Sequence, residues 1–206
     1  MATEDQLLDW AIELQSLAQA GLFYGKDVFD LERYERIREI AAQMIARKTD
    51  LSLEVVKDLY CSDSGYQTPK MDTRSAIFQD GKILLVQEKS GLWVLPGGFC
   101  DINLTVQENA IKEVKEEAGL TVEVERMIAL LDRSKHNLKK SMISAYKAFV
   151  LCRSIGGEFQ ENSETLASDY FSLENLPELD QRKTSYSQIA MCFEAAADEN
   201  WQVLLD

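Results

Sequence analysis

The sequence predicts an α+β domain preceded by a small all-α region, and two observations predict this division. Residues 1–65 hold no proline and only three of the ten glycines, and their apolar residues recur with helical spacing. From Gly65 onward, short apolar runs are bounded by glycine and proline, which is typical of strands. One amphipathic stretch separates the earlier runs from the later ones. We therefore expect a helical region over residues 1–65 and a second domain over residues 66–206.

The N-terminal region is expected to contain three short helices. They cover residues 7–22, 34–45 and 52–60, with Gly21 and Gly25 ending the first and Asp30 as the N-cap of the second. Helices this short form a thin core. Their apolar faces exceed what three helices can bury among themselves, so we expect a homodimer formed through this region. The faces carry Leu7, Trp10, Leu14, Tyr34, Ile37 and Ala41.

The second domain is expected to begin with a β-hairpin, because Asp80-Gly81 separates two apolar runs. A third run ends at Pro96-Gly97-Gly98, which predicts a tight turn. The later pattern predicts one helix, three further strands and a last helix. In chain order, the expected elements are strands over 74–78, 83–86 and 92–95, a helix over 106–118, strands over 121–131, 143–155 and 170–173, and a helix over 186–197.

Composition excludes several classes of protein. The chain has 35 acidic and 22 basic residues, for a net charge of −13, which makes nucleic acid an unlikely partner because both would be polyanions. No apolar run approaches the roughly 20 residues of a membrane span, and the acidic N-terminus does not resemble a signal peptide, so we expect a cytoplasmic protein. Widely spaced cysteines and one histidine disfavour a zinc site and predict free thiols. The cysteines are Cys61, Cys100, Cys152 and Cys192.

The expected helix over residues 106–118 carries three carboxylates close together. Successive residues advance by about 100° around a helix, so Glu113, Glu116 and Glu117 share one face. Like charges at this spacing repel, and a cation would offset them. Oxygen-only ligands favour Mg²⁺, with Mn²⁺ as a substitute. Because the glycine turn before the helix lets backbone approach a ligand closely, the segment suits metal-assisted hydrolysis of a phosphate compound.

This turn and helix resemble the Nudix box, G-x5-E-x7-R-E-U-x-E-E-x-G-U, where U is apolar. The match starts at Gly98 and departs at two positions, where Leu104 replaces the first glutamate and Lys112 replaces the arginine. Lysine keeps the charge but loses the bidentate fork, so we expect Glu108 to pair with Lys112 along the helix. The matching positions are Gly98, Glu113, Val114, Glu116, Glu117, Gly119 and Leu120.

The resemblance covers about residues 70–200 and implies an α/β/α sandwich with a mixed sheet, the Nudix fold. It implies hydrolysis of a nucleoside diphosphate linked to another moiety, with Mg²⁺ bound by Glu113, Glu116, Glu117 and the carbonyl of Gly97. An N-terminal helical region before the box is similar to the subgroup of ADP-ribose and CDP-choline pyrophosphatases, in which that region forms dimers.

The subgroup resemblance also implies roles for residues outside the box. Glu164 would serve as a base or a further metal ligand, with Glu161 as its substitute. The alternative catalytic base is one of Glu113, Glu116 and Glu117. Arg74 would contact a phosphate of a small nucleotide substrate, and Lys89 and His136 would also bind substrate.

The leading hypothesis is therefore a Mg²⁺-dependent pyrophosphohydrolase that yields a nucleoside monophosphate and a second phosphate, with ADP-ribose and CDP-choline as favoured substrates. One alternative is removal of pyrophosphate from RNA 5′ ends, which the acidic charge disfavours. The other is a non-catalytic nucleotide sensor, for which Leu104 is the main support.

Overall fold

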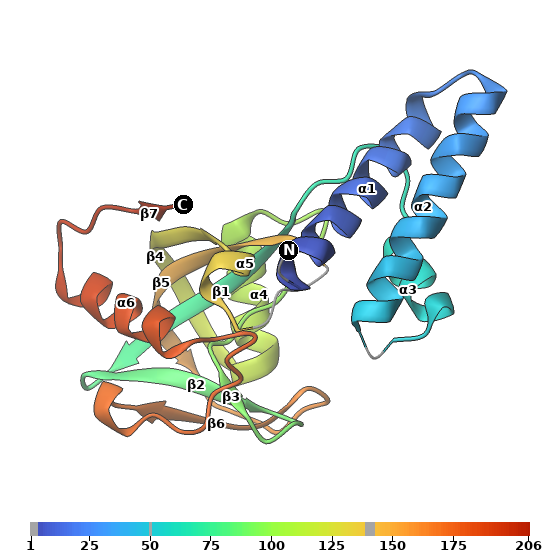
Figure 1. Cartoon of the computed structure of the whole chain (residues 1–206). Helices are drawn as coiled ribbons and strands as arrows, with labels where there is room; N and C mark the ends of the chain where they lie inside the picture. The colour runs from blue at the N-terminus through green and yellow to red at the C-terminus, as the bar shows by residue number, and fades with distance from the viewer. Residues whose placement is uncertain (1–3, 50, 139–142) are drawn as a thin grey trace. The chain divides into compact units, whose positions relative to one another are not determined.

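The computed structural model describes residues 4–49, 51–138 and 143–206. The chain divides into two compact units, Met1–Pro69 and Lys70–Asp206, which are described separately below (Figure 1). No helix in these described ranges is long and apolar enough to cross a membrane.

The first unit consists of the helices α1 (Glu4–Tyr24), α2 (Val28–Lys48) and α3 (Leu53–Tyr60). The α1 and α2 helices pack closely because Gly21 lies against the Tyr34 ring, where an added Cβ would come within 2.5 Å. The expected N-cap at Asp30 is wrong. The α2 helix begins earlier, since the Asp27 side chain accepts hydrogen bonds from the first-turn N–H groups, and Asp30 lies within that turn.

Small side chains form most of the buried part of this unit, together with two glutamines. Gln15 donates to the Tyr60 carbonyl and Gln19 donates to the Gly65 carbonyl, which ties α1 to the end of α3. Many large apolar side chains stay exposed, as the thin core predicts. They are Trp10, Leu14, Leu17, Phe23, Tyr24, Val28, Phe29, Ile40, Val55 and Leu59.

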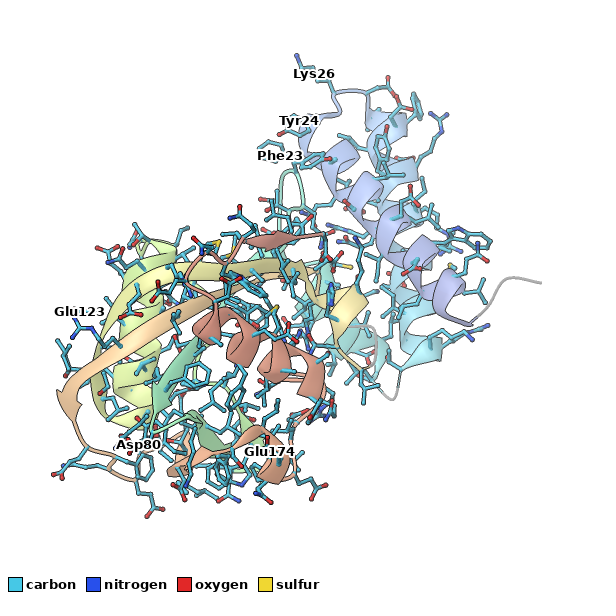
Figure 2. All side chains as sticks on the ribbon, turned by 90° about the vertical axis from the view of Figure 1, so that its left-hand side faces the viewer. Phe23, Tyr24, Lys26, Asp80, Glu123 and Glu174 are labelled. Atoms are coloured by element: carbon cyan, nitrogen blue, oxygen red, sulfur yellow. The ribbon has the colours of Figure 1, made fainter. Side chains whose placement is uncertain are left out.

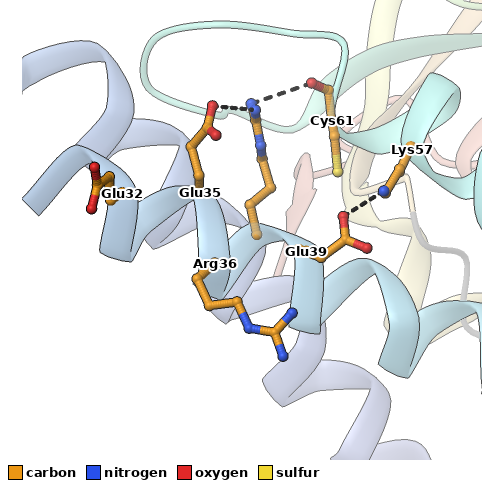
Figure 3. A pocket seen from close by; sticks show the side chains of 7 residues that line it. Glu32, Glu35, Arg36, Glu39, Lys57 and Cys61 are labelled. Atoms are coloured by element: carbon orange, nitrogen blue, oxygen red, sulfur yellow. Dashed lines mark hydrogen bonds and ion pairs between the residues drawn. The ribbon is translucent and has the colours of Figure 1, made fainter. Parts of the chain in front are cut away.

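A pocket of about 570 Å³ lies between α2 and α3, and charged side chains line it (Figure 3). Lys57 pairs with Glu39, and Arg38 reaches both Glu35 (3.7 Å) and the Cys61 carbonyl (3.5 Å). Because the Lys57–Glu39 pair and the Arg38 bond to Cys61 connect α2 to the α3 segment, the charged walls of the pocket have a structural role.

The second unit is built on a mixed sheet, with strands in the order β3-β2-β1-β5-β4-β7 and with β6 paired to β2. The central pair β1–β5 is parallel, while β1–β2 and β4–β5 are antiparallel. The strands are β1 (Lys70–Gln79), β2 (Lys82–Glu88), β3 (Trp93–Val94), β4 (Leu120–Asp132), β5 (Ala145–Gly157), β6 (Thr165–Phe171) and β7 (Leu204–Leu205).

Two helices cover the two faces of this sheet, each over its own apolar core. The α4 helix (Val106–Ala118) buries Ala110 and Val114 against one face, and α6 (Tyr186–Ala197) buries Ile189 and Cys192 against the other. Neighbouring β1 residues alternate between the cores, as a strand requires. The predicted α/β/α sandwich is therefore confirmed.

Several expected elements are found with the predicted bounds or nearly so. Helices α4 and α6 start and end at the predicted residues. The hairpin turn is confirmed at Asp80 and Gly81, whose φ angles of 50° and 74° match a type I′ turn. The four cysteines are free, as predicted.

Other bounds differ because strand pairing extends beyond the apolar runs. The β1 strand begins at Lys70 rather than Arg74, since residues 70–77 pair with β5. The β6 strand begins at Thr165, not residue 170, because it pairs along β2. Two short helices were not expected, α5 (Arg133–His136) and the 3-10 helix η1 (Leu173–Asn175).

Candidate active site

The turn predicted at Pro96-Gly97-Gly98 lies alongside β1. Ser75 donates to the Pro96 carbonyl (2.9 Å) and Thr73 to the Gly98 carbonyl (2.8 Å), so the turn is hydrogen-bonded as an extension of the sheet. Gly97 has a φ of +143°, and a Cβ there would lie 1.9 Å from the Thr73 oxygen. Only glycine allows this approach between backbones. We call residues 95–100 the glycine loop.

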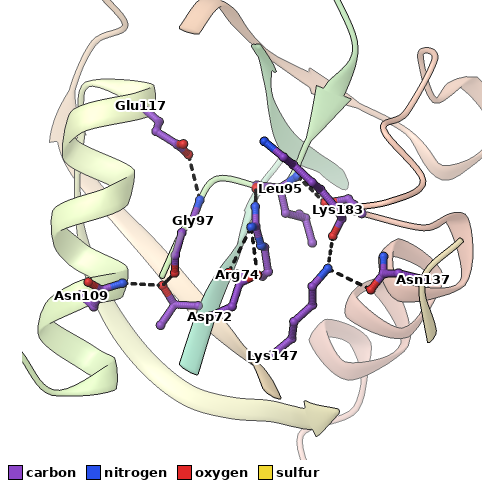
Figure 4. A network of polar contacts seen from close by, with 12 residues as sticks. Asp72, Arg74, Leu95, Gly97, Asn109, Glu117, Asn137, Lys147 and Lys183 are labelled. Carbon is purple, nitrogen blue, oxygen red and sulfur yellow. Dashed lines mark hydrogen bonds and ion pairs between the residues drawn. The ribbon is translucent and has the colours of Figure 1, made fainter. Parts of the chain in front are cut away.

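The α4 helix is held at both ends and presents its carboxylates to the glycine loop. A capping box of Thr105 and Glu108 starts the helix, and Gly119 ends it in the left-handed conformation. Glu117 Oε2 accepts a 2.8 Å hydrogen bond from the Gly97 N–H (Figure 4). A Cβ on Gly98 would lie 2.9 Å from Glu113 Oε2, so that carboxylate also packs on the loop.

Burial raises the pKa values of Glu113 and Glu117. Desolvation raises the pKa of Glu117 to about 7, against the lowering effects of the Gly97 N–H and the Arg74 charge. Burial also raises the pKa of Glu113, and the neighbouring Glu116 charge adds to this rise. Glu116 itself is exposed. Two buried carboxylates whose charged forms are disfavoured fit a site that receives a cation.

Lys112 lies among three acidic residues, two of them on α4. Its ammonium group is 3.2 Å from Asp101, 3.3 Å from Glu113 and 3.1 Å from Glu116, and these carboxylates raise its pKa. The expected pairing of Glu108 with Lys112 is not what forms. Glu108 closes the capping box at Thr105, because the N-terminal N–H groups of the helix are nearer to it.

The carboxylate oxygens of the site are the type of ligand that a hard divalent cation prefers, although they do not form a complete set of metal ligands. Within the described part of the chain, no three acidic, histidine or cysteine side chains converge as a ready group of metal ligands. Glu113 and Glu117 nevertheless supply buried carboxylate oxygens beside the glycine loop. Such oxygens suit Mg²⁺ or Mn²⁺ and not a soft metal.

Arg74 is buried behind the glycine loop, with 6% of its surface exposed. It donates to the Leu95 carbonyl (3.2 Å) and pairs with Asp72 (3.0 Å). Among the described residues, Arg74 Nε has no hydrogen-bond partner, and Asp72 Oδ1 meets Arg74 through the ion pair alone. Asp72 was not predicted as a site residue, although a carboxylate two residues before an arginine in a strand shares its face.

The turn that carries Glu164 is tied to the C-terminal end of α4. Thr165 Oγ1 donates to the Glu117 carbonyl (2.7 Å), and Asn162 Nδ2 donates to the Glu116 carbonyl (3.0 Å). Glu164 is exposed in this turn, as is Glu161. The structure therefore brings the predicted base into the same part of the fold as the α4 carboxylates.

The other two predicted substrate residues lie in two other segments of the second unit. Lys89 is exposed in the turn after β2. His136 is the last residue of α5 and lies 2.7 Å from Asp206 Oδ1, while Asp206 also accepts from the Asp132 N–H. The C-terminal segment, which pairs with β4 through β7, thus holds the His136 side chain.

Besides Asp72, two further polar residues of the site were not predicted from the sequence. Asn109 is fully buried and connects α4 to β1, since its side chain donates to Thr73 Oγ1 (2.9 Å) and accepts from the Asp101 N–H (3.1 Å). Lys147 is buried near the start of β5. Each of these residues could have been noticed in the sequence as a polar residue on the inward side of an otherwise apolar helix or strand pattern.

Comparison with known proteins gives a consistent result for both units. Residues 69–191 match the family described as the NUDIX domain, and residues 5–60 match the one described as the UDP-X-like, N-terminal oligomerisation domain. YjhB of Bacillus subtilis (strain 168) is 39% identical over 200 residues, which cover 97% of this chain and 96% of that protein.

Two solved structures share the fold. The crystal structure of an ADP-ribose pyrophosphatase from Streptococcus suis 89-1591 has 55% sequence identity and a TM-score of 0.64, covering 68% of this chain and 100% of that one. The crystal structure of a UDP-X diphosphatase has 31% identity and a TM-score of 0.64, covering 98% of this chain and 100% of that one. Box, fold and relatives agree, and the chain belongs to the Nudix hydrolase family of enzymes.

Proposed function

We propose that this chain is a Mg²⁺-dependent pyrophosphohydrolase of nucleoside diphosphates linked to another moiety, with ADP-ribose as the preferred substrate. The observation that carries this proposal is the contact of Glu113 and Glu117 with the glycine loop. It places two buried carboxylates beside backbone that a ligand can approach. The products are a nucleoside monophosphate and a second phosphate, here AMP and ribose 5-phosphate.

Each of the four glutamates predicted for the site has a proposed role. Glu113, Glu116, Glu117 and the Gly97 carbonyl would hold Mg²⁺, for which Mn²⁺ can substitute. When bound, the metal offsets the charge of the diphosphate and makes an attacking water more acidic. Glu164 accepts the proton of that water, and its turn is suited to this because it is hydrogen-bonded to the end of α4.

On the substrate side, Arg74, Lys89 and His136 are proposed to bind the nucleotide. Arg74 acts at the phosphates through a guanidinium that Asp72 and the Leu95 carbonyl already orient. Such fixed positive charge favours a diphosphate because little reorganisation is needed on binding.

Three substrates test the proposal. Purified chain is incubated with Mg²⁺ and ADP-ribose, CDP-choline or UDP-glucose, and the products are separated by chromatography. We expect AMP and ribose 5-phosphate to form fastest, because the Streptococcus suis relative that is 55% identical is named an ADP-ribose pyrophosphatase. Faster turnover of the uridine substrate would favour the chemistry named for the UDP-X diphosphatase, and release of pyrophosphate from 5′-triphosphate RNA alone would overturn the proposal.

The first unit is proposed to form a homodimer. The supporting observation is its row of exposed apolar side chains, among which Phe23 and Tyr24 project near the α1–α2 turn (Figure 2). Exposed patches of this kind mark association surfaces, and the region matches an oligomerisation domain.

Light scattering at micromolar concentration checks the dimer. We expect twice the 23.4 kDa chain mass for the wild type and a monomer after Leu17→Glu with Phe29→Glu, since charges would be buried in the interface. Ile155→Glu is the matched control, because this exposed residue lies at the far end of β5 in the other unit. A monomeric wild type would refute the dimer.

A further inference from the structure

Among the residues that the structure describes, one lysine lies in the interior of the sheet, where apolar side chains are the rule. Lys147, on β5, is 1% exposed, and its strand neighbours in register are Asp72 on β1 and Leu131 on β4. An ammonium group removed from water destabilises the fold unless hydrogen bonds replace its hydration. The contacts made by its Nζ therefore show what this lysine does.

The Lys147 ammonium joins two loops that come from distant parts of the sequence. It donates to Asn137 Oδ1 (2.9 Å) and to the Lys183 carbonyl (Figure 4). Asn137 directly follows His136 at the end of α5, and Lys183 lies in the turn before α6. The two loops also bond directly to each other, through Asn137 Nδ2 and the Gln181 carbonyl (3.2 Å).

The second loop continues the connection to the glycine loop. Thr184, next to Lys183, accepts a 3.1 Å hydrogen bond from the Leu95 N–H at the start of the glycine loop. Two residues farther along, the Gly97 N–H donates to Glu117. Contacts thus run without a break from the Lys147 ammonium to a proposed metal ligand on one side and to the His136 segment on the other.

The charges around Lys147 do not explain it as an ion pair. Arg74 and Asp72 face it from β1, Arg133 faces it from α5, and Asp180 faces it from the turn. Burial and the two arginines lower the pKa of Lys147 to about 7. A methionine of similar length would fill the same space without this cost. A buried polar residue that lowers the stability of the core is typical of a position kept for function.

We propose that Lys147 is a positioning residue that holds the His136 segment and the glycine loop in their working arrangement across the sheet. The inference rests on the proposed hydrolysis for its kinetic part and on the contacts alone for its structural part. Lys147 touches neither substrate nor metal in this proposal and acts through Asn137 and the turn at Lys183 and Thr184.

The variant Lys147→Met tests this by removing the ammonium while keeping the length of the side chain. Arg126→Met is the matched control, since Arg126 is also a cation that donates to backbone carbonyls, at the C-terminal end of α6 and away from the site. His136 is the chain's single histidine, so its imidazole NMR signals report on the α5 segment in the absence of substrate.

We expect Lys147→Met to shift the His136 signals, to raise the KM for ADP-ribose and to lower kcat/KM by about 10- to 100-fold. Its melting temperature is expected to equal or exceed that of the wild type. Arg126→Met should leave the His136 signals and KM unchanged. This combination separates positioning from a merely structural role, which would lower activity and melting temperature together.

Asn137→Ala provides a second variant in which Lys147 remains in place. It is expected to shift the same NMR signals and to raise KM, with a smaller effect on kcat because the link to Thr184 survives. Unmoved His136 signals in both variants, or kinetics that match Arg126→Met, would overturn the inference. An inactive wild type would instead refute the proposed function, while the NMR comparison would still decide the structural part.

Discussion

Glu117→Gln is expected to lower kcat for ADP-ribose by about 10³-fold. The carboxylate is buried beside the glycine loop and is a proposed metal ligand, so the amide loses the charge that the metal requires. The amide oxygen can still accept from Gly97, which preserves the loop. Steady-state assays with Mg²⁺ check this, with the exposed Glu174→Gln as a control whose kcat should not change. Wild-type turnover in Glu117→Gln would exclude Glu117 from the chemistry.

The same variant is expected to be more stable than the wild type when metal is absent and the pH is high. The pKa of Glu117 is about 7 in the folded chain, above the value of 4.5 for an ordinary glutamate, so folding takes up a proton between these values. Wild-type stability is then full below pH 4.5 and falls as the pH rises through 7. The variant avoids this loss, which amounts to about 3 kcal/mol.

Urea unfolding with EDTA at pH 5 and pH 8 measures this difference. The two proteins should be nearly equal at pH 5 and should diverge at pH 8, and adding Mg²⁺ should restore stability to the wild type alone. If the free energies of unfolding of the two proteins changed equally with pH, the charged form of Glu117 would not destabilise the fold. Activity and stability are thus expected to change in opposite directions, which simple unfolding of the variant cannot produce.

Gly97→Ala is expected to lower kcat/KM by about 10²-fold. At a φ of +143°, the new Cβ would lie 1.9 Å from the Thr73 carbonyl oxygen, so the glycine loop must move away from β1. That movement displaces the N–H that binds Glu117, and displacements of about 1 Å reduce catalysis to this extent.

Gly81→Ala is the matched control for this experiment. Gly81 also has a positive φ, of +74°, but a Cβ there meets no atom within 4 Å. The control should lose about 1 kcal/mol of stability from backbone strain and keep its kcat/KM. Equal kcat/KM values in both variants would show that the contact of a Cβ at Gly97 with β1 does not affect catalysis.

Local sequence signals predicted those parts of the fold that depend on neighbouring residues. Helix α4 starts and ends where its apolar spacing predicts, with a capping box and Gly119 at its two ends, and the Asp80-Gly81 hairpin depends on two residues that accept positive φ. The grouping of Glu113 and Glu117 follows from helix periodicity alone. These features could be predicted because each is decided within a few residues of chain.

Other features arise only when distant segments meet. The length of β1 depends on its pairing with β5, and the burial of Arg74 depends on Asp72 and the Leu95 carbonyl. The predicted pairing of Lys112 with Glu108 was wrong, because Lys112 instead reaches Asp101, whose position depends on the course of the loop before α4.

The sequence by itself determined the family and the order of the main elements, and it predicted the carboxylates of the site, because the box, the apolar periodicity and the turn residues are local patterns. Only the tertiary structure decided which polar groups lose their water. The buried Glu117, the ion pair at Arg74 and the lysine inside β5 have properties set by desolvation and by partners from far along the chain. Desolvation depends on everything that packs around a group, and spacing in one dimension does not contain that information.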